Sequence, residues 1–185
     1  MRNPLLGFKE KLEAFEIVTL RLVGFFPLHC VRVWALRAFG ADVSRDAVVY
    51  HGFLVRAARG LRIGRRCNVG EGAVLDGRGG LVLGDDVNLS SDVHIWTAQH
   101  DWNSPDFAYV SASVEIEGRV WLGPRVTVLP GASIGEGAVV AAGAVVSGRL
   151  EPGGLYGGVP ARRLADRTAD LQYHLPSPRG KLWWW

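Results

Sequence analysis

The sequence predicts an all-β fold, a parallel β-helix built from six-residue repeats, and two observations lead to this prediction. Glycine accounts for 24 of 185 residues, as expected for a chain that turns a corner every six residues. Aliphatic residues recur with the same six-residue period, because three hexapeptides close one triangular coil of such a helix. We expect these aliphatic side chains to point inward and stack into one core. The repeated positions are Val43, Val49, Val55, Ile63, Val69, Leu75, Leu83, Leu89 and Ile95, and, after one gap, Ile116, Leu122, Val128, Ile134, Val140 and Val146.

The repeats divide the chain into three zones. Residues 1–40 lack the period and are predicted to be a helical extension, and residues 41–162 form the β-helix. A loop at residues 97–113 interrupts the β-helix. Residues 163–185 form a basic and then aromatic tail that ends in Trp183, Trp184 and Trp185. Tryptophan favours boundaries between water and apolar surfaces, so the tail is a candidate for a membrane or protein contact.

Charge and cysteine content narrow the function. The net charge of +3 is mild, and the basic residues are spread along the chain, so the sequence does not predict a nucleic-acid partner. Cys30 and Cys67 do not form a disulfide framework. Cys67 occupies a small inward position of its hexapeptide, and we expect its thiol to be buried.

The N-terminal extension has two interpretations. Its longest charge-free stretch, residues 22–31, contains Pro27 and is too short to span a bilayer. The segment 28–39 alternates apolar residues with Arg32 and Arg37. It could cap the open end of the β-helix or pack between subunits, and it could equally lie on a membrane surface.

The predicted chemistry lies where the repeat breaks. His100 comes just after the last regular strand, and a neutral imidazole there can take a proton from a hydroxyl near pH 7. Asp92, Asp101 and Asp106 are the carboxylates that could orient it. The alternative is a histidine of a surface loop without a catalytic role.

Five segments, in this order along the chain, resemble the maltose and galactoside O-acetyltransferases of the hexapeptide-repeat acyltransferase superfamily. Residues 39–41 and the His100-Asp101 pair followed by Phe107 are most similar to the branch that acetylates sugars during exopolysaccharide (colanic-acid-type) biosynthesis. The five segments are HIWTAQH at 94–100, VWLG at 120–123, LPGASIG at 129–135, AGAVV at 142–146 and GGVPAR at 157–162.

This resemblance implies a left-handed β-helix that assembles as a homotrimer, with active sites at the subunit interfaces. It also implies acetyl-CoA as co-substrate, no metal and a cytoplasmic location. His100 would act as general base, with Asp101 beside it, on an acceptor hydroxyl that attacks the thioester. Backbone N–H groups would hold the oxyanion. The residues that match the family's cofactor groove are Trp121, Gly123, Ala141, Ala142, Gly143, Arg149, Pro160, Arg162 and Arg163.

The chain departs from the family in two places. The family's Thr-Lys after Val145-Val146 is replaced by Ser147-Gly148-Arg149, so that Arg149 would have to take over the contact with the CoA phosphates. The family's acceptor-binding asparagine falls near Glu71. The resemblance therefore implies Glu71, Asn88 and Trp96 as acceptor-binding residues, with Asn68 and Asn88 as the weaker substitutes for that asparagine.

The sequence thus predicts an acetyl-CoA-dependent O-acetyltransferase of a saccharide hydroxyl, in surface polysaccharide or glycoconjugate biosynthesis, in the cytoplasm or at the inner face of the membrane. A small soluble acceptor, either an antibiotic or a free sugar, is the alternative substrate. Two other classes stay open. One is a non-catalytic β-helix scaffold, and the other is a γ-type carbonic anhydrase with His51, His94 and His100 as zinc ligands.

Overall fold

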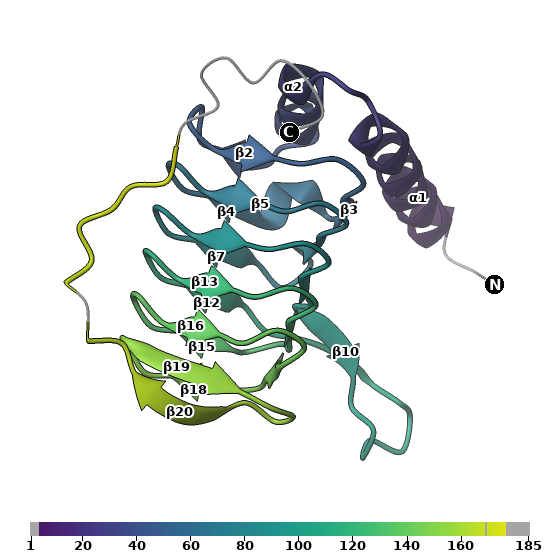
Figure 1. Cartoon of the computed structure of the whole chain (residues 1–185). Coiled ribbons are helices and arrows are strands. Elements are labelled where there is room, and N and C mark those ends of the chain that lie inside the picture. The colour runs from purple at the N-terminus through teal and green to yellow at the C-terminus, as the bar shows by residue number, and fades with distance from the viewer. Residues whose placement is uncertain (1–3, 169, 177–185) are drawn as a thin grey trace.

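The computed structural model describes residues 4–168 and 170–176, and it confirms the predicted left-handed parallel β-helix. The solenoid has about six turns and carries two helices at its N-terminal end (Figure 1). The predicted contact of the terminal tryptophans, Trp183 to Trp185, lies outside the described residues.

Three sheets form the three faces of the solenoid, because each hexapeptide contributes one short strand and each coil stacks on the one before it. Face 1 contains β1 (Asp42–Val43), β4 (Leu61–Ile63), β7 (Leu81–Leu83), β12 (Val114–Ile116), β15 (Ser133–Ile134) and β18 (Arg149–Leu150). Face 2 contains β2 (Val48–Val49), β5 (Asn68–Val69), β8 (Asn88–Leu89), β13 (Trp121–Leu122), β16 (Val139–Val140) and β19 (Gly154–Gly157), followed by the antiparallel β20 (Arg162–Asp166). Face 3 contains β3 (Leu54–Arg56), β6 (Val74–Asp76), β9 (His94–Ile95), β14 (Thr127–Val128) and β17 (Val145–Val146).

The parallel register stacks the repeated aliphatic residues into columns inside the solenoid. On face 2, for example, Val69 pairs with Leu89, Leu89 with Leu122 and Leu122 with Val140. All fifteen aliphatic residues of the two predicted series are buried. Cys67 is buried among them as expected, and burial raises the pKa of its thiol to about 12.

The two N-terminal helices, α1 (Pro4–Gly24) and α2 (His29–Ala38), differ in how they use their apolar side chains. Helix α2 covers the first coil, where it buries Arg32, whose guanidinium donates to the carbonyl oxygen of Val49. Helix α1 contacts β3 but leaves a row of large apolar side chains exposed. The row consists of Leu12, Phe15, Val18 and Leu22, and the exposed Phe25 follows just after the end of the helix. Within the part of the chain that the structure describes, neither helix has the length and apolar character needed to cross a membrane.

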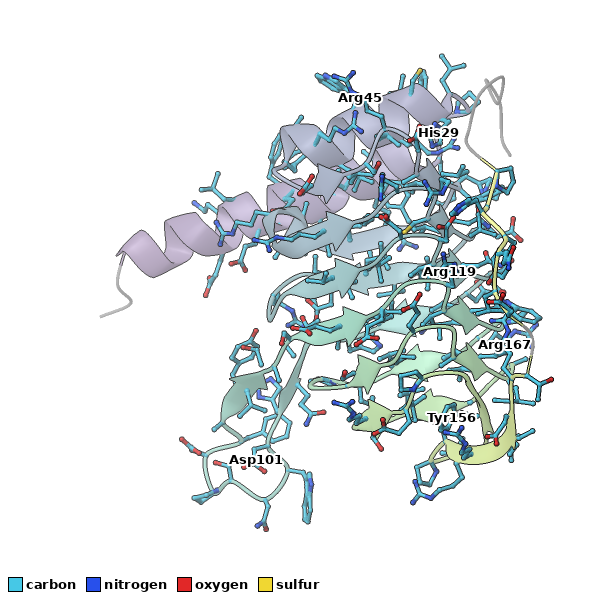
Figure 2. All side chains as sticks on the ribbon, turned by 90° about the vertical axis from the view of Figure 1, so that its left-hand side faces the viewer. His29, Arg45, Asp101, Arg119, Tyr156 and Arg167 are labelled. Atoms are coloured by element: carbon cyan, nitrogen blue, oxygen red, sulfur yellow. The ribbon has the colours of Figure 1, made fainter. Side chains whose placement is uncertain are left out.

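The break in the repeat forms a hairpin. Strands β10 (Ala98–His100) and β11 (Tyr109–Ser111) pair antiparallel and project from the corner between face 3 and face 1 (Figure 1). A short 3-10 helix, η1 (Ala58–Gly60), occupies the same corner two coils earlier. Helix α1 lies on the same side of the solenoid as the hairpin in both Figure 1 and Figure 2.

The C-terminal segment crosses back over the solenoid and is held by one buried carboxylate. Asp86, at 2% exposure, accepts hydrogen bonds from the Arg66 guanidinium, from the backbone N–H of Leu175 and from Nδ1 of His174. Burial alone would raise the pKa of Asp86, but these hydrogen bonds outweigh it and hold the pKa well below its ordinary value. The hydrogen bonds of Asp86 therefore hold residues 174–175 against the second and third coils.

Because these hydrogen bonds need the ionised carboxylate of Asp86, we expect their contribution to stability to depend on pH. A carboxyl whose pKa is lowered by folding stabilises the protein above its ordinary pKa, and that contribution is lost as the pH falls through the folded-state pKa. We expect the wild type to have a higher urea midpoint than Asp86→Asn. The difference between the two midpoints should be largest at neutral pH and should shrink below about pH 4. A margin that stays constant down to acidic pH would contradict the role of the ionised carboxylate.

Candidate active site

The His100 ring is held in one orientation by the hairpin. Its Nδ1 lies 2.7 Å from the carbonyl oxygen of Phe107, and its plane stacks on the Phe107 ring with 4.3 Å between centroids. Tyr109 meets His100 edge-on at 6.1 Å. Phe107 can present both its ring and its carbonyl because its backbone takes a left-handed conformation, with φ of 52°.

This contact determines which ring nitrogen can act as a base. A carbonyl oxygen only accepts hydrogen bonds, so Nδ1 must carry a proton and donate it to Phe107. In the neutral ring, Nε2 is then unprotonated and can accept a proton from a hydroxyl. His100 is exposed, so an acceptor molecule can approach Nε2.

None of the three candidate carboxylates makes this contact. Asp101 accepts a hydrogen bond from the backbone N–H of Asn103, 2.9 Å away, and Asp106 accepts one from the hydroxyl of Ser104. Asp92 lies in the corner between β8 and β9. In this structure a backbone carbonyl therefore orients His100, in place of the expected side chain. The reason is the tight turn at Phe107, which the sequence pattern does not reveal.

Trp121 and the small residues matched to the cofactor groove are stacked at or beside another corner, between face 2 and face 3. Trp121 precedes the corner in its coil, and its Nε1 donates to the hydroxyl of Ser90 at 3.0 Å. Gly123 lies above Ala142, and a Cβ placed on Gly123 would come within 2.8 Å of the Ala142 nitrogen. In the next coil this corner is formed by Ala141, Ala142 and Gly143, and nothing lies within 4 Å of a Cβ built on Gly143. The corner is therefore narrow, lined by small side chains and open to solvent.

Arg162 and Arg163 begin β20, next to the last strand of face 2, whereas Arg149 lies on β18 of face 1, away from this corner. Two of the three arginines are engaged within the chain. Arg149 pairs with Glu151 at 2.9 Å, and Arg163 pairs with Asp166 at 2.7 Å. Within the described part of the chain, the Arg162 guanidinium donates only to the carbonyl of the preceding Ala161. Pro160 is exposed at the end of the column and follows a cis peptide bond.

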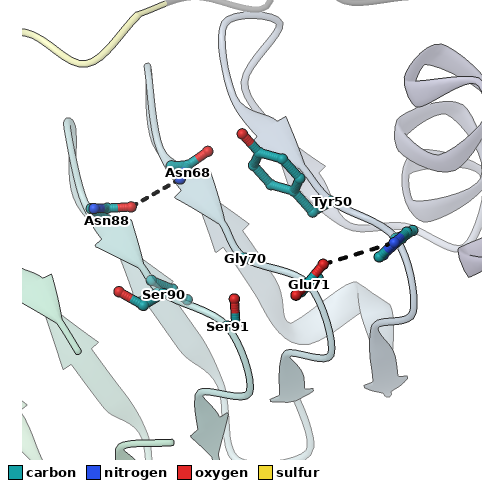
Figure 3. Close-up of a pocket in the computed structure, with 9 residues that line it drawn as sticks. Tyr50, Asn68, Gly70, Glu71, Asn88, Ser90 and Ser91 are labelled. Atoms are coloured by element: carbon teal, nitrogen blue, oxygen red, sulfur yellow. Dashed lines mark hydrogen bonds and ion pairs between the residues drawn. The ribbon is translucent and has the colours of Figure 1, made fainter. Parts of the chain in front are cut away.

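Two of the predicted acceptor residues, Glu71 and Asn88, line one cavity of about 320 Å³ (Figure 3). This cavity lies at the same corner as the small-residue column, one to three coils before Trp121, and Ser90 borders both the cavity and Trp121. Asn68 and Asn88 are joined by a hydrogen bond of 2.9 Å, and His51 lies 3.8 Å from Glu71. The third predicted residue, Trp96, lies just after β9 on face 3, beside His94, and does not line the cavity.

The cavity also contains Tyr50, Ser90 and Ser91, which were not predicted from the sequence, and His51, which was considered only as a zinc ligand. These residues belong to two series with a spacing of twenty residues. One series is Tyr50, Gly70 and Ser90, and the other is His51, Glu71 and Ser91. The twenty-residue repeat of the first coils places such residues directly above one another. That spacing is the signal that could have identified them.

The base and the cavity belong to different corners of one chain. His100 lies on the hairpin between face 3 and face 1, whereas Glu71, Asn88 and Trp121 lie at or beside the corner between face 2 and face 3. Figure 2 shows Asp101, next to His100, on the hairpin and far from Tyr156 at the end of face 2. A second copy of the chain would be needed to bring a hairpin to this cavity.

The three histidines considered as zinc ligands are also separated. His51 lines the cavity, His94 is on β9, and His100 is on the hairpin. Among the described residues, no group of three or more His, Cys, Asp or Glu side chains is arranged to hold a metal ion.

The repeats, the solenoid and the extruded loop define a hexapeptide-repeat protein with the architecture of the acyltransferases it was predicted to resemble. Residues 113–148 match the family model described as bacterial transferase hexapeptide (six repeats). No curated protein sequence matches the chain.

Solved structures extend the likeness over most of the chain. A hexapeptide-repeat-containing acetyltransferase from Vibrio cholerae O1 biovar eltor, in complex with acetyl-CoA, is 27% identical, with a TM-score of 0.77 over 86% of this chain and 89% of that one. A maltose O-acetyltransferase from Clostridium difficile 630 is 22% identical, with a TM-score of 0.73 over 85% and 87% of the two chains. A galactoside acetyltransferase in complex with coenzyme A is 19% identical, with a TM-score of 0.67 over 89% and 90%. The last two show the shared fold. The family-model match and the 27% identical acetyltransferase bear out the predicted resemblance and the predicted enzyme class, an acetyltransferase of the hexapeptide-repeat type.

Proposed function

We propose that this protein is an acetyl-CoA-dependent O-acetyltransferase that acts on a saccharide hydroxyl in surface polysaccharide or glycoconjugate biosynthesis. The single observation that carries the proposal is the His100 ring, whose Nδ1 is engaged by the Phe107 carbonyl so that Nε2 is free to act as a base. A histidine fixed in this way at the mouth of an extruded hairpin suits the deprotonation of an alcohol.

The proposed reaction requires no covalent enzyme intermediate. Nε2 of His100 takes the proton of the acceptor hydroxyl as its oxygen attacks the thioester carbonyl, which forms a tetrahedral oxyanion held by backbone N–H groups. The carbon–sulfur bond then breaks, and the proton passes from the imidazolium to the leaving thiolate. The products are the acetyl ester and free CoA. Cys67 is unsuited to be a nucleophile because its thiol is buried and, with a pKa of about 12, stays protonated.

The corner between face 2 and face 3 supports the proposed binding of the donor. Small residues at Gly123, Ala142 and Gly143 allow an extended pantetheine arm to approach the backbone closely. Arg162 has no carboxylate partner among the described residues, so its guanidinium could bind the phosphates of CoA. The amide and hydroxyl groups of the adjoining cavity, such as Asn88 and Ser91, suit hydroxyl groups of a sugar.

We also propose that the active protein is a homotrimer. The argument is the separation of His100 from the cavity within one chain, since a neighbouring subunit could complete the site. Static light scattering should give three times the chain mass of 20.1 kDa. A fully active monomer would contradict this arrangement.

For the location, we propose the cytoplasm, with peripheral contact at the inner face of the membrane. The exposed row on α1, which includes Phe15 and Leu22, supports this contact because apolar side chains on one helix face can enter the lipid headgroup region. Flotation with vesicles containing anionic lipid tests the proposal. Recovery of the protein only in the lipid-free fraction would overturn the membrane part of it.

The function itself is tested by a release assay for the CoA thiol with acetyl-CoA and a panel of acceptors. The panel contains free sugars, nucleotide sugars, lipid-linked sugars and antibiotics. We expect thiol release that depends on a saccharide acceptor, with an acetyl ester detected in the product by mass spectrometry. Transfer to an antibiotic alone would favour the small-molecule alternative, and no transfer to any acceptor would contradict the proposed function.

A further inference from the structure

A second cavity, of about 410 Å³, lies at the corner of the hairpin, between α1 and the solenoid. Arg59 and Arg78 line it, together with Glu13 of α1 and Tyr109 of the hairpin. A smaller cavity of about 80 Å³ shares Glu13 and Arg78 with it and adds Arg56. Arg78 borders both cavities, Arg59 borders the larger and Arg56 the smaller, and the two adjoining cavities are called the recess below.

This recess is one side chain away from the proposed base. The Tyr109 ring that lines it lies 6.1 Å from the His100 ring, edge to face. The Arg78 guanidinium carbon lies 5.9 Å from the centroid of the same Tyr109 ring. A group held by the arginines would thus place the atoms attached to it close to His100.

The Arg78 guanidinium is held in place before any ligand binds. Its Nε and Nη2 bind the two carboxylate oxygens of Asp76, each at 2.8 Å, and Asp76 is fully buried. Asp76 also accepts a hydrogen bond from the backbone N–H of Thr97, at the entry to the hairpin. The same buried carboxylate therefore positions both the arginine and the hairpin, so Arg78 needs little reorganisation to receive a ligand.

Arg56 and Arg59 differ from Arg78, because neither guanidinium makes a hydrogen bond or ion pair with another of the described residues. Of the nearby acidic groups, Asp76 is already paired with Arg78, and Glu16 accepts the backbone N–H of Ala58. Glu13 also lines the recess and is engaged in an interaction of its own. The guanidinium groups of Arg56 and Arg59 therefore border the recess without a hydrogen-bond partner among the described residues.

The floor of the recess is backbone. A Cβ built on Gly60 would collide with the carbonyl oxygen of Gly77 in the coil below, and one built on Gly77 would collide with that of Ala57. Glycine at both positions lets the two corners pack closely and keeps side chains out of the recess floor.

We propose that this recess is the subsite for a phosphate or diphosphate group carried by the acceptor, held by Arg56, Arg59 and Arg78 while the attached sugar extends past Tyr109 to His100. This proposal rests on the proposed function and narrows its substrate class. Guanidinium groups match phosphate oxygens with paired, charge-assisted hydrogen bonds, which neutral sugars do not require. Nucleotide-linked and lipid-linked sugars share this chemistry.

The first test measures the binding of inorganic pyrophosphate by calorimetry. The full chain is saturated with CoA beforehand, so that the donor groove is already filled. The wild type should bind pyrophosphate, and the double variant Arg56→Gln/Arg59→Gln should bind it at least about 10-fold more weakly. Arg62→Gln is the matched control because Arg62 is exposed on β4 and lines neither cavity. Pyrophosphate binding that is absent, or equal in all three proteins, would overturn the subsite.

A second arm uses thiol release to separate the possible sources of phosphate. A UDP-sugar, a polyprenyl-diphosphate-linked sugar in detergent micelles and the same free sugar are compared. We expect the double variant to lose about 10-fold or more in kcat/KM on whichever phosphate-bearing acceptor is used, and to act on the free sugar like the wild type. Equal losses on both, or a preference for a free uronic acid, would overturn the phosphate assignment and leave the transferase intact. Absence of thiol release with every acceptor would instead remove the proposed function.

Discussion

Replacing His100 with alanine is expected to lower turnover by about 10²–10⁴-fold, the range that loss of a general base produces. The acceptor hydroxyl would then have to lose its proton to water during attack on the thioester. Binding of acetyl-CoA should change little, because the residues of the donor groove lie at a different corner from His100. Turnover is measured by CoA thiol release, and donor binding by calorimetry.

The matched control for this variant is Gln99→Ala. Gln99 is exposed on the same strand of the hairpin and pairs with Val110, but its side chain has no part in the proposed chemistry. It should retain near wild-type turnover. If His100→Ala were as active as Gln99→Ala on a good acceptor, His100 would not be the base.

The largest expected effect on stability comes from the core of the solenoid. Leu122 is fully buried between Leu89 and Val140 in the column of face 2, so Leu122→Ala should lower the free energy of unfolding by about 2–5 kcal/mol. The lost side chain leaves a cavity that the stacked coils on both sides cannot close. Urea denaturation at a fixed protein concentration measures the change.

Leu22→Ala serves as the control, since Leu22 is 70% exposed on α1. The same substitution there should stay within about 0.5 kcal/mol of the wild type. A loss below about 1 kcal/mol for Leu122→Ala would mean that the column is not the core that holds the coils together.

The fold could be predicted from the sequence because its core is periodic. One aliphatic position per hexapeptide, from Val43 to Val146, determines both the strand positions and their stacking, and no long-range information is needed. The single break in the period likewise indicated where the hairpin with His100 leaves the solenoid. These features are local in sequence, so the pattern alone reveals them.

The details of the candidate site depend on three-dimensional contacts that have no such period. The group that orients His100 is the backbone carbonyl of Phe107, and a carbonyl has no signature in the sequence. The recess with Arg59 combines a corner of the solenoid with a helix more than forty residues earlier, at Glu13. The pairing of Arg149 with Glu151 also could not be anticipated from the resemblance that assigned Arg149 to CoA.

The most direct test of the account combines two inactive variants in one oligomer. His100→Ala removes the base but leaves the groove, whereas Ala142→Trp fills the exposed donor corner but leaves the base. If each site joins the hairpin of one subunit to the groove of its neighbour, random 1:1 mixed trimers should recover about a quarter of the wild-type sites. We expect co-refolded mixtures to show this gain in thiol release over the two variants refolded separately. Activity no higher than that of the separate variants would contradict a site shared between subunits.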